Sequence, residues 1–118
     1  MVIRGLSSLM SVFALTACQH AQPVSPAVLQ SADAETLMAL RSALGQALGR
    51  AEIELGAGDP TTEPSVAVLP PKPTTFETQS PAMPTMFDLF VRGETCFAVQ
   101  RGNEVEITLP GVACRSSG

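Results

Sequence analysis

The chain of 118 residues contains no tryptophan, no tyrosine and only one histidine. With ten prolines and nine glycines in addition, it is not expected to build one large hydrophobic core. The single histidine, His20, leaves a Ser/His/Asp triad or a histidine metal site without the neighbours that each needs. Phosphate-binding glycine loops are missing as well. We therefore expect no enzyme, no metal and no other cofactor.

Positive charge is also scarce, with seven Lys and Arg against eleven Asp and Glu and a formal net charge of -4. The basic residues stand singly along the sequence, whereas binding to nucleic acid depends on clustered Lys and Arg. No nucleic-acid partner is expected. No pattern in the sequence indicates a small-molecule substrate.

The longest apolar run is shorter than the roughly 20 residues that a membrane-spanning helix needs. It follows Arg4 and ends at Leu15-Thr16-Ala17-Cys18. A basic start, a short apolar middle and a small-residue exit are the order of a secretory signal. The last four residues resemble the lipobox of a bacterial lipoprotein precursor. The resemblance implies that residues 1–17 are a signal peptide and Cys18 is the lipid attachment site; an ordinary secretory signal is the alternative.

The lipoprotein resemblance also implies a location. Such precursors are cut before the cysteine and acylated on it, and two or three acyl chains make an effectively permanent membrane anchor. In this class an aspartate after the cysteine retains the product in the inner membrane, but here Gln19 follows Cys18. We expect a cell-envelope protein, held on the inner leaflet of the outer membrane and facing the periplasm in a Gram-negative cell.

A helix is predicted over residues 33–57, after a lipidated tether at residues 18–32. Ser31 or Asp33 can cap its N-terminus. Apolar residues recur every three or four positions and form one stripe, which consists of Leu37, Leu40, Leu44, Leu48, Ala51 and Leu55. An isolated helix of this length is marginal in water. We expect this face to bind a protein partner or a second copy, with packing inside the chain as the alternative.

Proline punctuates residues 58–85, and this composition predicts an extended linker, in which Val66-Ala67-Val68-Leu69 can form at most one short strand or a docking segment. Residues 86–118 instead alternate apolar and polar side chains, with turn signals at residues 93–94 and 101–104, and predict a small antiparallel β module. Cys96 and Cys114 remain once Cys18 is assigned to lipid. In an oxidising envelope they are expected to form a disulfide that staples this module.

Taken together, these segments predict a largely irregular α+β chain: signal peptide, one amphipathic helix, Pro-rich linker and a small disulfide-stapled antiparallel β module. The expected function is that of an envelope lipoprotein with a structural or protein-interaction role. A lipidated cysteine, a helix and a proline-rich body also broadly resemble the outer-membrane subunit of phage spanin pairs, which implies a lysis function as the alternative. A small lipoprotein of a secretion apparatus shares the same features.

Overall fold

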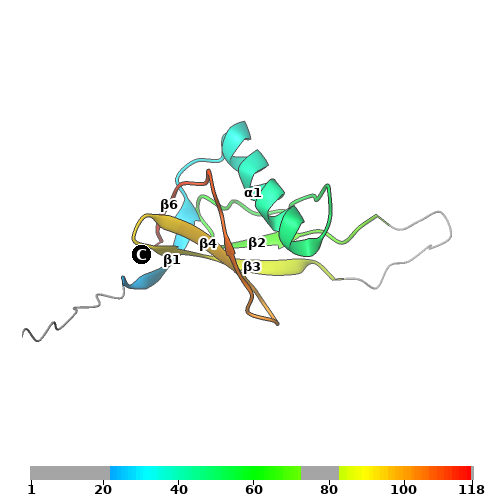
Figure 1. Ribbon diagram of the computed structural model, residues 1–118. Coiled ribbons are helices and arrows are strands. Elements are labelled where there is room, and N and C mark those ends of the chain that lie inside the picture. Colours follow the sequence, from blue (N-terminus) through cyan, green and yellow to red (C-terminus); the bar gives the residue numbers. More distant parts are fainter. Residues whose placement is uncertain (1–21, 73–82, 118) are drawn as a thin grey trace, which may run out of the picture.

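The computed structural model of the chain describes residues 22–72 and 83–117. They form one helix and one antiparallel sheet of six strands, with the helix against one face of the sheet (Figure 1). The elements in chain order are β1 (Val24–Leu29), α1 (Ala34–Leu48), β2 (Ser65–Val68), β3 (Thr85–Arg92), β4 (Thr95–Gln100), β5 (Glu106–Thr108) and β6 (Cys114–Ser116). The predicted α+β class is confirmed.

Strand β3 is the centre of the sheet because it pairs with three other strands. β4 pairs with it on one edge. On the other edge, β2 pairs with the first half of β3 and β1 pairs with the second half. The later residues of β1 pair with β6, and β5 adds to the free edge of β4. The strand order is β5-β4-β3-β1-β6, with β2 beside β3.

Two strands lie where the sequence predicts irregular chain. β1 occupies part of the expected tether at residues 18–32, and β2 lies within the expected linker at residues 58–85. Leu29 of β1 and Val68 of β2 are fully buried. Both strands are short and have prolines nearby, so their composition looks like that of a linker although they contribute to the core. The described residues are therefore more regular than the sequence predicts.

Helix α1 begins where expected but ends earlier. Asp33 is the N-cap, and its Oδ1 accepts a hydrogen bond of 2.8 Å from the Thr36 N–H. At the other end Gly49 adopts a left-handed φ of 67°, and its N–H donates to carbonyls of the last turn. Glycine takes this conformation without a Cβ clash. The helix therefore ends at Leu48 and does not continue to residue 57.

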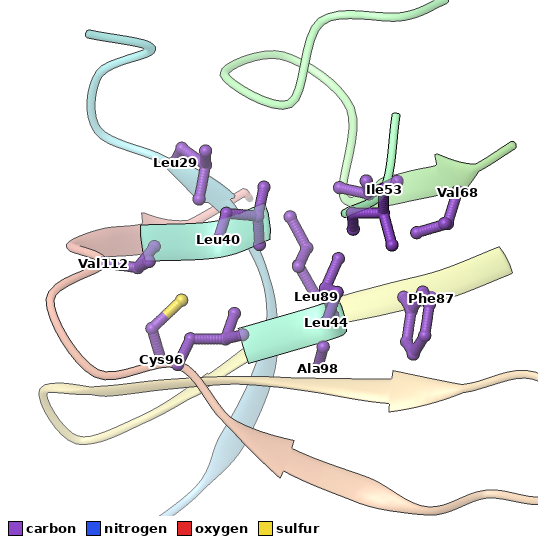
Figure 2. Packing of buried hydrophobic residues seen from close by; sticks show 12 residues of the cluster. Leu29, Leu40, Leu44, Ile53, Val68, Phe87, Leu89, Cys96, Ala98 and Val112 are labelled. Atoms are coloured by element: carbon purple, nitrogen blue, oxygen red, sulfur yellow. The ribbon is translucent and has the colours of Figure 1, made fainter. Parts of the chain in front are cut away.

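The leucine face of α1 covers the sheet and closes the core (Figure 2). Leu40 and Leu44 are fully buried, in one cluster with Phe87 and Leu89 of β3. The other buried members of this cluster are Leu29, Ile53, Val66, Val68, Cys96, Ala98, Leu109 and Val112. Side chains from both ends of the chain thus share one core.

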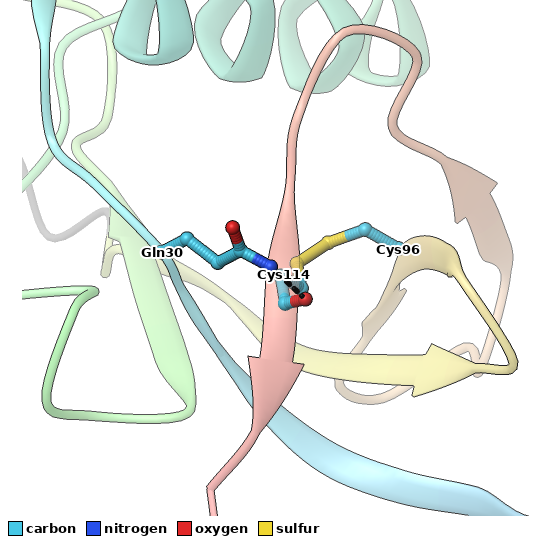
Figure 3. The surroundings of a disulfide bond; sticks show 3 residues. All are labelled: Gln30, Cys96 and Cys114. Atoms are coloured by element: carbon cyan, nitrogen blue, oxygen red, sulfur yellow. Dashed lines mark hydrogen bonds between the residues drawn. A yellow bond between two sulfur atoms is a disulfide. The ribbon is translucent and has the colours of Figure 1, made fainter.

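Cys96 of β4 and Cys114 of β6 form the predicted disulfide (Figure 3). Their Cα atoms are 5.6 Å apart, and the two positions are separated by 18 residues. β4 and β6 are not neighbours in the strand order, so the disulfide joins parts of the sheet that no ladder of hydrogen bonds connects directly. The Gln30 side-chain amide donates to the Cys114 carbonyl at 3.1 Å and holds the end of β1 beside this bond.

Strands are confirmed in the predicted C-terminal module, where β3, β4 and β5 follow one another through the expected turns. This module is not a separate folding unit, however. Its strands pair with β1 and β2, and its inner face packs against α1. Residues 86–117 complete their core with segments that precede them by more than fifteen residues.

Candidate functional site

The predicted lipid attachment site, Cys18, lies outside the described residues, as do the signal peptide at residues 1–17 and His20. In the part of the chain that the structure describes, no helix is long and apolar enough to cross a membrane. Likewise, no three His, Cys, Asp or Glu side chains of residues 22–72 and 83–117 are grouped as ligands for a metal ion.

The helix face predicted to bind a partner is occupied by this chain's own core. Leu40 and Leu44 are fully buried, and Leu37 and Leu48 pack at the margin of the same cluster. The last two residues of the predicted stripe, Ala51 and Leu55, lie beyond the end of α1. For Leu40 and Leu44 the interpretation as a docking face is wrong, because both side chains are fully buried in this chain's own core, whereas Leu37 and Leu48 are only half-buried.

A groove lies instead along the other flank of α1. Its walls are the exposed side of the helix and the chain that returns after Gly49, and it has a volume of about 1130 Å³. The lining residues come from three places: Met38, Arg41 and Ser42 of α1; residues 50–55; and residues 70–72. Met38 is 65% exposed, a high value for a large apolar side chain. Arg41 and Leu55 also line a second hollow of about 300 Å³, so the two hollows adjoin along α1.

Gly45 allows the chain after α1 to pack closely against the helix. It is buried in the last turn of α1, and a Cβ at this position would lie 2.8 Å from the Arg50 carbonyl oxygen. The same carbon would lie 3.7 Å from the Ile53 side chain. Glycine therefore allows the returning chain to approach the helix. The Arg50 N–H donates to the Gly45 carbonyl at 2.8 Å and fixes that approach.

The returning chain also extends the sheet. Leu55 forms an isolated antiparallel bridge with Val68 of β2. The flanking hydrogen bonds, both 2.8 Å long, are Gly56 N–H to Ala67 C=O and Leu69 N–H to Glu54 C=O. In this pattern the N–H and C=O of Leu55 point away from β2. Among the described residues no hydrogen bond to either group is found, so the sheet ends there in an open backbone edge.

Charges of both signs surround this edge. The Arg50 guanidinium donates to the Leu69 carbonyl at 3.0 Å and is thereby held in place. Lys72 and Glu54 form an ion pair of 3.8 Å between side chains that are 85% and 62% exposed. A pair this exposed contributes little to stability. Arg41 is exposed, and no ion pair to it is found within the described residues.

Among the described titratable groups, shifted pKa values are found only at two capping or turn aspartates and at one surface ion pair. Hydrogen bonding by the side chain and the amide of Thr36 lowers the pKa of Asp33, and Thr61 lowers the pKa of Asp59 in the same two ways. A bidentate hydrogen bond to Asp88, together with its charge, raises the pKa of Arg101. Each shift is explained by local structure, and none belongs to a residue that lines the larger groove.

On the opposite face of the sheet, an aromatic pair is covered by a cation. Phe90 and Phe97 stack with their ring centroids 5.6 Å apart, and the Arg92 guanidinium lies 4.6 Å above the Phe97 ring. Arg92 also pairs with Glu106 at 3.1 Å. Phe97 is only 3% exposed. This cluster therefore closes the outer face of the sheet and does not provide an open binding surface.

The sequence contained a signal for the groove that helical periodicity concealed. Glu52, Ile53, Glu54 and Leu55 alternate polar and apolar side chains, as an edge strand does. The spacing of Leu48, Ala51 and Leu55 also fits a helix, and this spacing predicts a helix that continues to residue 57. Comparisons with protein-family models, curated proteins and solved structures find no match.

Proposed function

We propose that the protein is a lipid-anchored lipoprotein of the bacterial cell envelope with a protein-interaction role. One observation carries this proposal: of the three cysteines in the chain, Cys96 and Cys114 are bonded to each other, which leaves Cys18 alone at the lipobox. Structural disulfides persist in oxidising compartments such as the periplasm. Gln19 favours the outer membrane, on the periplasmic side, as the place of residence.

The interaction role is supported by the groove beside α1. A partner segment in an extended conformation would add to the open edge at Leu55 through its main chain. Its side chains would lie against Met38, and an acidic side chain would pair with Arg41. The partner is therefore proposed to be a protein with an extended, partly apolar segment that carries an acidic residue.

The lysis alternative receives no support from the fold. The likeness to spanin subunits depends on a helix and a proline-rich body, but α1 packs on a six-stranded sheet that includes β2. No specific feature of the described residues favours a secretion apparatus either. The interaction lipoprotein is therefore the function that we put forward.

Membrane attachment is tested by fractionating cells that produce Cys18→Ser. The variant should remain uncut or leave the membrane fraction, because serine cannot form the thioether to lipid. The double variant Cys96→Ser/Cys114→Ser removes two cysteines but keeps Cys18, so it is the matched control and should stay with the membrane. Unchanged processing and fractionation of Cys18→Ser would overturn the proposal.

The groove is tested by photo-crosslinking in intact cells, with a photoreactive amino acid at Met38 or at Gln46. Both positions are exposed on α1, but only Met38 lines the groove. A discrete crosslinked protein is expected at Met38 and not at Gln46, and the added substitution Arg41→Glu should weaken it. Crosslinks of equal strength at both positions, or at neither, would exclude this groove as the docking site.

A further inference from the structure

The first residue that the structure describes, Gln22, is very close in sequence to the proposed anchor. Gln22 already lies against the turn between β3 and β4, where a Cβ on Gly93 would collide with the Gln22 side chain. Only four residue steps separate Gln22 from Cys18. Since an extended chain spans at most about 3.6 Å per residue, this distance is at most about 14 Å. The bound holds for every conformation of the residues between them.

The register of the sheet identifies the end that lies near the anchor. Val24 is opposite Arg92, the last residue of β3 before the turn, and the Ser117 N–H donates to the Pro26 carbonyl at 2.9 Å. The start of β1, the β3–β4 turn and the end of β6 are therefore together. We call this the anchor end, defined by Gln22, Val24, residues 93–95 and Ser117.

The groove lies at the opposite end of β3. Val68 is opposite Thr85, the first residue of β3, and Leu55 is bridged to Val68. β3 has eight residues, which at about 3.3 Å per residue separates its two ends by roughly 23 Å. β1 and β2 lie along opposite halves of β3 (Figure 1).

We infer that the domain sits directly on the membrane, with its anchor end against the lipid headgroups and its groove turned toward the aqueous space. This inference rests on the proposed lipidation of Cys18. The ligand of the anchor end is the bilayer surface itself. Val24 is 48% exposed there and can enter the interface. Arg92 is paired with Glu106. The proposed contact between the anchor end and the bilayer therefore does not depend on the positive charge of Arg92. The acyl anchor supplies the binding, and the short connection supplies the orientation.

The orientation is tested with the purified lipidated protein in vesicles of phosphatidylethanolamine and phosphatidylglycerol that carry a headgroup-linked acceptor dye. A donor dye is attached through an unnatural amino acid at Glu94, which is part of the anchor end, or at Lys72, which lines the groove. Energy transfer from Glu94 should be about twofold stronger or more, because the strand length holds Lys72 further from the surface. Equal transfer from both sites, or stronger transfer from Lys72, would overturn the orientation.

A longer connection provides the second variant. Inserting ten Gly and Ser residues after His20 extends the maximum reach to about 50 Å, so the two transfer values should converge. If they keep their difference, the short connection is not its cause and the inference fails. Flotation of the protein with the vesicles is measured in the same samples. A protein that does not float contradicts the lipid anchor itself, whereas one that floats with equal transfer contradicts only the orientation.

Discussion

At the scale of single residues, Gly45 and Asp33 both determine how the end regions of helix α1 are held. Gly45 lies in a helix interior, where glycine costs about 1 kcal/mol relative to alanine. The structure accounts for it, because the Arg50 carbonyl occupies the space that a Cβ would need. Asp33 caps the same helix through its bond to Thr36. Each residue leads to a prediction about the stability of the protein.

Gly45→Ala should destabilise the protein although alanine is the better helix former. The expected net loss is about 1 kcal/mol, since overpacking costs about 1–3 kcal/mol and improved helix propensity returns about 1 kcal/mol. Urea unfolding measures this change. Ser42→Ala, on the exposed side of the same helix, is the control and should be neutral or slightly stabilising. A stabilised Gly45→Ala protein would mean that the returning chain is not held against α1.

Asp33→Asn should remove a pH-dependent part of the stability. The pKa of Asp33 is lowered from 3.8 in the folded chain by hydrogen bonding to Thr36, so folding favours the ionised form. The stabilisation is therefore present above pH 3.8 and is lost as the pH falls through the lowered value. Asparagine can still cap the helix. Thermal unfolding from pH 7 to pH 2 should give a smaller difference between the two proteins in acid, and a constant difference would contradict this role.

At the scale of elements, helix α1 packs on the sheet and covers the core. Two of its leucines are completely buried against the sheet, whereas the exposed Met38 on its other flank belongs to the groove. Substitutions on the two flanks should therefore have different consequences. The buried flank is expected to affect stability, and the exposed flank is expected to affect only the proposed binding.

Leu44→Asp should unfold the domain, because even truncation of a buried leucine to alanine costs about 2–5 kcal/mol and a buried charge costs more. Met38→Glu should leave stability within about 0.5 kcal/mol, as surface substitutions generally do. Circular dichroism and denaturant unfolding measure both. A Leu44→Asp protein that keeps native stability would restore the leucine stripe as a docking face and contradict the core described above.

Elements with strong local signals could be predicted from the sequence. Asp33 as a possible cap, the hairpin strands β3 to β5 and the Cys96–Cys114 pair were predictable because each depends on nearby residues or on cysteine number. β1 was not predictable, and β2 was open only as one short strand at residues 66–69. The partners of both strands in β3 are distant in sequence, and their own composition is that of a linker. The groove was missed for a related reason: the chain reverses at Gly49, while the apolar spacing continues past it.

At the scale of the whole molecule, segments from both halves of the chain form one domain, which the shared core and the disulfide hold together. Removing the disulfide with Cys96→Ser/Cys114→Ser should lower the free energy of unfolding by about 3 kcal/mol, the loop-closure value for positions 18 residues apart. Urea titration of the oxidised protein and the double variant gives this difference. Equal unfolding midpoints would show that the core alone fixes the relation of β4 to β6.

A lipid-anchored domain with its groove turned away from the bilayer depends on one claim above the others, that Cys18 carries lipid while Cys96 and Cys114 are bonded. The intact mass of the membrane-extracted protein, before and after reduction, tests it most directly. We expect a chain that starts at Cys18, carries two or three acyl chains and gains two hydrogens on reduction. An unacylated chain that starts elsewhere, or one whose mass does not change on reduction, would contradict it.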